Sequence, residues 1–127
     1  MNFSAIPHLL GSQAESGPEA IALLAPDRIS LTYGRLAEQV AAVIPRLNDL
    51  GIGRNDRLAI VLPNGPEMAL AFLSIASAAT SAPLNPAYRA SEFDFYLSDL
   101  NARALVVLAG DQSPARAVAL ARDIPVI

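Results

Sequence analysis

Short apolar runs alternate with helical segments along the second half of the chain, and this alternation restricts the fold more than any other feature. The unbroken apolar run Leu58–Leu62 is typical of a parallel strand that is covered on both faces. Pro66 suits the first position of a helix, and the helix predicted there continues to about Ala79. A second short strand follows over 82–84. Strands and helices of these lengths, joined by short loops, predict right-handed crossovers and a parallel sheet.

The same alternation continues to the last residue. Ser91, with Asp94 three residues later, resembles a capping box and predicts the start of another helix. The remaining predicted elements are that helix as far as Leu100, a strand over 104–108, a helix from Ser113-Pro114 to Arg122 and a fourth strand over 124–127. The chain ends inside this last strand without a polar tail, so we expect it to be a fragment of a longer protein.

The first part of the chain predicts a small helical and hairpin unit. Its elements are a helix over 6–16, a hairpin of two runs over 20–24 and 29–31, and a long helix from Thr32 to Leu50. Thr32 is a good N-cap, and Gly51 supplies the helix stop. Pro45 should kink this helix or shorten its last turn. We expect residues 1–56 to form one structural unit with the incomplete βαβαβαβ subdomain of residues 57–127.

Composition excludes several classes of protein. The 127 residues suit one domain, and 53% hydrophobic with 17% charged residues indicates a globular chain. A formal net charge of -3 gives no basic face for nucleic acid. The absence of cysteine excludes disulfides and thiolate metal sites. The sequence shows neither a signal-peptide pattern nor an apolar run long enough to cross a bilayer, so we expect a cytoplasmic protein.

Residues that usually carry out catalysis are missing. All nine basic residues are arginine, and no glycine-rich phosphate loop is present. The close pair Gly51-Ile52-Gly53 precedes a strand instead of linking a strand to a helix, which favours a helix stop and a turn. His8 is the sole histidine, so neither a Ser–His–Asp triad nor a two-histidine metal site can form. We therefore predict no catalytic residue and no metal ligand in this chain.

One loop, Asn85–Arg89, has features of a ligand site. It follows a predicted strand at the edge where open α/β sheets bind ligands, and Arg89 could contact a phosphate. The alternative is a proline-fixed turn with Arg89 in solvent. Aromatic residues nearby could line an apolar pocket, although packing between helix and sheet also accounts for them: Tyr88, Phe93, Phe95 and Tyr96.

Five segments, in order along the chain, resemble signatures of the adenylate-forming enzymes, which include acyl-CoA synthetases, luciferases and nonribosomal adenylation domains. The segments are Leu31–Leu36 (LTYGRL), Leu50–Ile60 (LGIGRNDRLAI), Leu62–Glu67 (LPNGPE), Ile75–Asn85 (IASAATSAPLN) and Ala104–Val107 (ALVV). The Pro-Leu-Asn-Pro run over 83–86 favours acyl- or aryl-CoA synthetases over nonribosomal domains. Four residues depart from the family pattern, and these departures bear on local helix geometry: Arg35, Pro45, Thr80 and Ser81.

The resemblance implies a longer enzyme that uses ATP and Mg²⁺ to activate a fatty or aromatic acid as an acyl-adenylate. The acyl group would then pass to coenzyme A (CoA). The family's phosphate loop, ribose-binding aspartate and catalytic lysine match no position here, so none of these roles is carried over. In some relatives an arginine near the Asn-Pro turn helps to hold CoA phosphates, and Arg89 lies near the corresponding place.

We therefore expect an α/β fold: a flavodoxin-like parallel sheet with helices on both faces, preceded by a small helix and hairpin. The chain would be a fragment of the large N-terminal domain of an AMP-forming acyl-CoA synthetase. Alone it should be inactive and bind no cofactor, with the rest of the ligase as its partner, and exposed apolar surface should cause self-association. Two alternatives remain open, a freestanding non-catalytic binding or assembly module and a small flavodoxin-like nucleotide binder.

Overall fold

A parallel sheet forms the centre of the computed structural model, which describes residues 5–127. Three strands, β3 (Arg57–Val61), β4 (Thr80–Pro83) and β5 (Ala104–Val107), lie in the order β4-β3-β5. Leu58 is aligned with both Ser81 and Ala104, so the three strands run in register. Beyond β5, the chain end adds a single parallel bridge between Leu105 and Val126. If the strands of this sheet are numbered along the chain from β3, with Val126 as the fourth, their order is 2-1-3-4, which is the flavodoxin-like arrangement.

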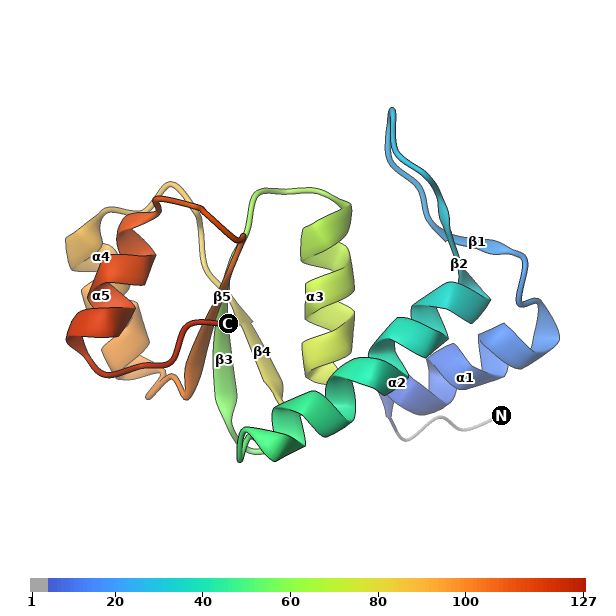
Figure 1. The fold of residues 1–127 in the computed structure, drawn as a ribbon, viewed down its shortest axis with the longest axis horizontal. Coiled ribbons are helices and arrows are strands. Elements are labelled where there is room, and N and C mark those ends of the chain that lie inside the picture. The colour runs from blue at the N-terminus through green and yellow to red at the C-terminus, as the bar shows by residue number, and fades with distance from the viewer. Residues whose placement is uncertain (1–4) are drawn as a thin grey trace.

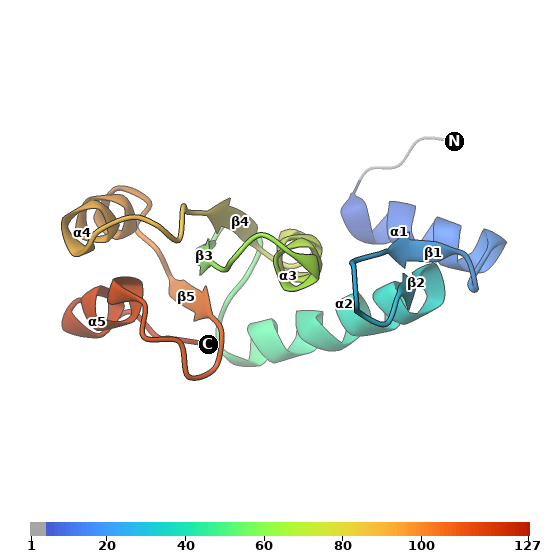
Figure 2. The same cartoon turned by 90° about the horizontal axis from the view of Figure 1, so that it is seen from above.

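Helices cover both faces of this sheet (Figure 1). One face carries α4 (Ala90–Asp99) and α5 (Pro114–Ala121), which pack side by side (Figure 2). The other face carries α3 (Pro66–Ala76) and the C-terminal half of α2 (Tyr33–Asp49). The flavodoxin-like α/β fold expected from the sequence is therefore confirmed.

The alternation of side chains along β3 divides the core into two layers. Leu58 and Ile60 are fully buried in the layer beneath α2 and α3. Ala59 and Val61 are equally buried in the opposite layer, where Phe93 of α4 packs without solvent exposure. A strand that is apolar on both faces requires helices above and below, which explains why residues 58–61 of β3 are all apolar.

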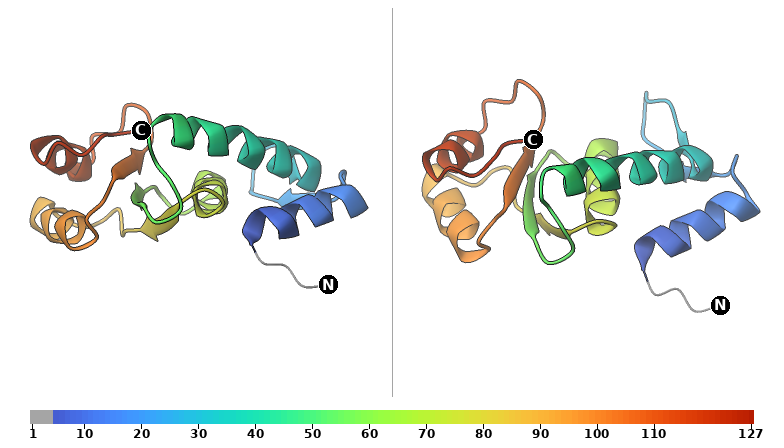
Figure 3. Two further views of the ribbon diagram at one scale, coloured as in Figure 1. Left: turned by 90° about the horizontal axis from the view of Figure 1, so that it is seen from below. Right: turned by 60° about the horizontal axis from the view of Figure 1, so that its bottom comes forward.

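The first part of the chain extends to one side of the sheet (Figure 3). It contains α1 (Ile6–Ser16) and an antiparallel hairpin of β1 (Ile21–Leu23) and β2 (Leu31–Thr32). Helix α1 packs against the N-terminal half of α2. A third cluster of buried residues joins these elements to the outer side of α3: Leu10, Leu36 and Val40, with Leu70 and Leu73 packed against them.

The ends of α2 match the sequence prediction, and Pro45 lies inside the helix. The Thr32 Oγ1 atom accepts a hydrogen bond of 3.2 Å from the Arg35 amide, and Gly51 takes the left-handed conformation with φ 75°. The helix is not shortened at Pro45 and continues to Asp49. Proline removes one intrahelical donor, but α2 is held along both sides by α1 and α3, so the turn persists.

Three predicted boundaries need correction. The N-cap of α4 is Arg89 instead of Ser91, because Oε2 of Glu92 accepts a 2.6 Å hydrogen bond from the Arg89 amide. Helix α3 ends at Ala76 instead of Ala79, since the chain must turn before β4 begins at Thr80. The last predicted strand is reduced to one bridge, although the Ile127 amide still donates a 2.8 Å hydrogen bond to the Leu105 carbonyl.

Candidate functional site

The carboxyl ends of β3, β4 and β5 meet at one edge of the sheet, where folds of this type bind ligands. Three loops form this edge: 62–65 leads into α3, 84–89 leads into α4, and 108–113 leads into α5. Each helix therefore presents its N-terminus here, and free backbone N–H groups at such positions attract anions. The question is whether these positions are available to a phosphate.

At α3 the chain supplies its own anion. Pro66 and Glu67 occupy the first turn, and proline has no N–H to offer. The Glu67 carboxylate forms an ion pair with Arg28 of the hairpin loop. The hydrogen bond from Arg28 lowers the pKa of Glu67 below its ordinary value, and a hydrogen bond from the backbone of Glu67 lowers it further. The N-terminus of α3 therefore faces a carboxylate that stays charged under ordinary conditions.

The other two loops are occupied in the same way. At α4 the Glu92 carboxylate accepts from the Arg89 amide at 2.6 Å. Before α5, Oδ1 of Asp111 accepts from the Ser113 amide at 3.1 Å, and the Ser113 hydroxyl accepts from Ala115 at 3.2 Å. All three helix N-termini at this edge thus have an acidic side chain of the same chain beside them.

A nucleotide triphosphate does not fit these residues. Its phosphates would meet three carboxylates, and Pro63 in the loop after β3 and Pro66 at the start of α3 lack N–H donors. The described residues contain no group of three or more His, Cys, Asp or Glu side chains that could hold a metal ion.

Arg89, the residue predicted to contact CoA, lies at this same edge. Its side chain is exposed and makes no ion pair or hydrogen bond to another described residue. Behind it, Tyr88 stacks on Tyr96 with ring centroids 5.1 Å apart and packs edge-on against Phe93 at 5.8 Å. The Tyr96 hydroxyl beside it raises the pKa of Tyr88. Tyr88, Phe93 and Tyr96 therefore anchor the loop by packing, whereas Phe95 is 62% exposed.

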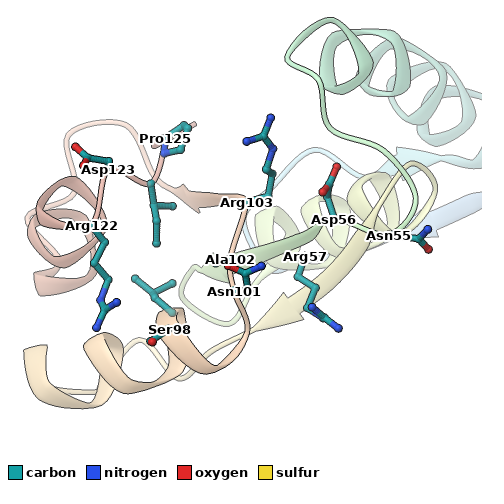
Figure 4. Close-up of a pocket in the computed structure, with 12 residues that line it drawn as sticks. Asn55, Asp56, Arg57, Ser98, Asn101, Ala102, Arg103, Arg122, Asp123 and Pro125 are labelled. Carbon is teal, nitrogen blue, oxygen red and sulfur yellow. The ribbon is translucent and has the colours of Figure 1, made fainter.

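A polar hollow of about 410 Å³ lies at the opposite edge of the sheet (Figure 4). Three arginines line it, but Arg103 points away from Arg57 and Arg122. Arg122 donates to the Asp94 carboxylate at 2.7 Å, which lowers the pKa of Asp94 and raises that of Arg122. Arg57 donates to the Leu100 carbonyl at the end of α4, at 3.3 Å. Arg57 and Arg122 thus bind to α4, and the three arginines do not converge on a ligand.

The sequence places Glu92 in the first turn of a helix, where a carboxylate favours the helix dipole, but sequence reasoning missed Glu67 and Asp111. A signal existed for Glu67, because it stands within the first turn of a helix that was correctly predicted. Asp111 gave a weaker signal, since its role depends on the course of the loop after β5. His8, the sole histidine, is exposed on α1.

Comparison with known proteins identifies the family. The family model described as AMP-binding enzyme matches residues 10–126. An oxalate–CoA ligase from Arabidopsis thaliana is 36% identical over 121 residues, which cover 94% of this chain and 24% of the relative. A probable CoA ligase from Humulus lupulus is 37% identical over 112 residues, which cover 87% of this chain and 21% of the relative. The chain thus spans less than a quarter of the length of these relatives.

Solved structures agree with this match. The N-terminal domain of FACL13 from Mycobacterium tuberculosis superposes with a TM-score of 0.78 and 27% identity, covering 94% of this chain and 30% of that one. VinN, at 21% identity, has a TM-score of 0.83 and supports the fold. None of the helices over residues 5–127 has the length and apolar character needed to cross a membrane. The chain belongs to the AMP-binding enzyme family and corresponds to part of the N-terminal domain of these adenylate-forming enzymes.

Proposed function

We propose that this chain is the N-terminal scaffold of an AMP-forming acyl- or aryl-CoA synthetase. The longer enzyme would join a carboxylate to the AMP part of ATP with release of pyrophosphate, then transfer the acyl group to the CoA thiol with release of AMP. The observation that carries the proposal is the match to an oxalate–CoA ligase along 94% of the chain. The oxalate in the name of that relative is not extended to this chain.

The geometry supports a scaffold instead of a self-sufficient enzyme. Each helix N-terminus at the ligand edge has a carboxylate of the same chain beside it, which argues against an ATP site among the described residues. This argues equally against a small flavodoxin-like nucleotide binder. In the longer enzyme ATP, Mg²⁺ and CoA would be held mainly by residues outside this segment.

An ATP–pyrophosphate exchange assay tests the proposal. The 127-residue chain should give no exchange with any carboxylic acid, whereas the longer ligase should give exchange and, with CoA, a thioester. Clear exchange by the short chain would overturn the scaffold role. A longer chain that folds but forms no thioester with a broad panel of fatty and aromatic acids would favour a non-catalytic assembly module.

Arg89 is proposed to contact a phosphate of CoA in that longer enzyme. A charge-assisted hydrogen bond to phosphate contributes about 1.5–3 kcal/mol, so Arg89→Ala should raise the KM for CoA about tenfold or more. The KM for ATP should stay unchanged. Arg54→Ala is the matched control, because Arg54 is also exposed but lies at the opposite edge of the sheet. Equal effects of the two variants would remove Arg89 from the site.

Three further parts of the proposal concern the state of the chain. Residues 1–56 and 57–127 are proposed to act as one structural unit. The short chain is proposed to associate with itself through exposed apolar side chains.

A cytoplasmic location is proposed because the reaction consumes ATP and CoA. Cell fractionation with an antibody against the chain tests this location.

A further inference from the structure

An apolar groove lies between α2, α3 and the end of the chain, on the face of the sheet opposite α4 and α5. Its volume is about 290 Å³, and its walls are Val43 and Leu47 of α2 with Leu70 and Ala71 of α3. Ile75 of α3, Val106 of β5 and Ile127 add further apolar lining, and the polar side chains of Gln39 and Glu67 also border the groove. Polar atoms contribute little to the surface of this groove, and it borders the buried residues Leu47 and Ile75 of the core. The groove is therefore a part of the core that lacks a cover.

A buried hydroxyl faces the same groove. Ser74 of α3 lines it and is only 3% exposed. Its Oγ atom is the sole buried side-chain nitrogen or oxygen without a hydrogen-bond partner among the described residues. Buried polar atoms in native proteins are almost always paired, so an unpaired one beside an open apolar groove indicates a missing partner group.

The topology explains why none of the five helices covers this place. The chain steps from β3 to β4 through α3 on one face, then steps in the opposite direction to β5 and to Val126 through α4 and α5 on the other face. Right-handed crossovers in opposite directions must use opposite faces. Continuing outward past Val126 would therefore add helices beside α5, and the groove side would be covered only by a segment that returns across the sheet.

We infer that a later segment of the longer ligase chain returns across the sheet and fills this groove with apolar side chains and one hydrogen-bonding group for Ser74. The inference rests on the proposed function, because it requires that longer chain. The relatives supply room for such a segment, since this chain spans only 24% of the oxalate–CoA ligase. An occupant on the same chain also has the advantage of a high effective concentration over a second molecule.

Single-cysteine labelling tests the inference, because these 127 residues contain no cysteine. Ala71→Cys places a thiol in the groove, and Ala117→Cys places one on the exposed side of α5 as the matched control. Alkylation of each position is followed by peptide mass spectrometry in the longer ligase, native and unfolded in urea. The native Ala71→Cys thiol should react at least tenfold more slowly than the Ala117→Cys thiol, and both should react alike in urea.

Each outcome distinguishes the possible occupants. Equal native reactivity of the two thiols would overturn the inference, even if the ligase forms acyl-CoA normally. Protection that disappears on dilution would assign the groove to a second copy, and protection that disappears after lipid extraction would assign it to a bound apolar molecule. Either result would also overturn the inference. In the separate 127-residue chain at high dilution, the Ala71→Cys thiol should react as fast as the control.

Discussion

Ser74 and Ser77, near the end of α3, differ in how their hydroxyls are satisfied. The Ser77 hydroxyl donates to the Leu73 carbonyl at 2.8 Å, whereas the Ser74 hydroxyl has no partner within the described chain. An unsatisfied buried hydroxyl costs about 1–3 kcal/mol, while a satisfied one contributes about 1 kcal/mol. The two residues therefore allow the same chemical change to be compared in two states of pairing.

Ser74→Ala should stabilise the 127-residue chain by about 1 kcal/mol, because it removes a buried group that is not hydrogen-bonded. In the longer ligase the same change should destabilise by about 1 kcal/mol, since the partner group would lose its contact. Urea unfolding of both proteins measures the two values.

Ser77→Ala is the control, and it should destabilise both proteins alike. A Ser74→Ala effect of the same sign in both proteins would show that the hydroxyl finds no partner in the longer chain. The comparison of one variant in two proteins also cancels the difference in helix propensity between serine and alanine.

Residue positions were predictable where the signal is local. Thr32 and Gly51 were identified because an N-cap and a left-handed stop depend on the residues next to them. The cap of α4 was misplaced because Asp94 pairs with Arg122, a residue of the next helix. No pattern within one helix reveals that Asp94 is engaged across a helix pair.

At the scale of elements, one ion pair joins the hairpin to the helix that faces the ligand edge. Arg28 lies in the loop between β1 and β2, and Glu67 in the first turn of α3. The side chains are 54% and 44% exposed, so solvent screens the pair, and its contribution to stability should be small. The contribution of this pair to stability should nevertheless change with pH.

Stability from this pair should be lost in acid. The pKa of Glu67 is lower in the folded chain than in the unfolded chain, so the contribution is complete above the ordinary carboxyl pKa of about 4.3 and fades as the pH falls below it. The difference in urea midpoint between the wild type and Glu67→Gln should therefore be present at neutral pH and absent at about pH 3.

Glu38→Gln provides a comparison, because the Arg35–Glu38 pair is more exposed, at 76% and 71%, and longer, at 3.6 Å. It should change the midpoint little at either pH. If the Glu67→Gln variant shifts the urea midpoint equally at both pH values, the shift does not come from loss of the ion pair.

The type and order of the elements could be predicted from the sequence, and several of their ends could not. The apolar runs of β3 and β5 and the proline starts of α3 and α5 are local patterns. The pairing of 124–127 depends on a neighbour beyond the edge of the sheet, and only the Leu105–Val126 bridge forms. The end of α3 likewise depends on where β4 must begin in order to pair with β3.

At the scale of the whole molecule, large apolar side chains remain on the surface of the hairpin unit. Exposed fractions are 56% for Ile21, 77% for Leu24 and 100% for Ile29. Both strands of this two-stranded hairpin also have a free edge. An apolar patch beside an unpaired strand edge favours association.

We therefore expect the 127-residue chain to self-associate in a concentration-dependent manner, as measured by multi-angle light scattering. The double variant Leu24→Asp and Ile29→Asp should shift the chain toward the monomer, because it places charges on the patch and at the hairpin loop. Glu15→Asp on α1, an exposed change that conserves charge, should leave the association unchanged. A monomeric wild type at high concentration would contradict this expectation.

Helix α2 belongs to both parts of the molecule. Its first half packs with α1 and the hairpin, and its second half places Leu47 in the core beneath α3. Because the two cores share this helix, neither core can unfold without exposing one end of it, and the two should unfold together on heating. We expect the chain to show a single melting transition, with calorimetric and van't Hoff enthalpies that agree, instead of two separate steps.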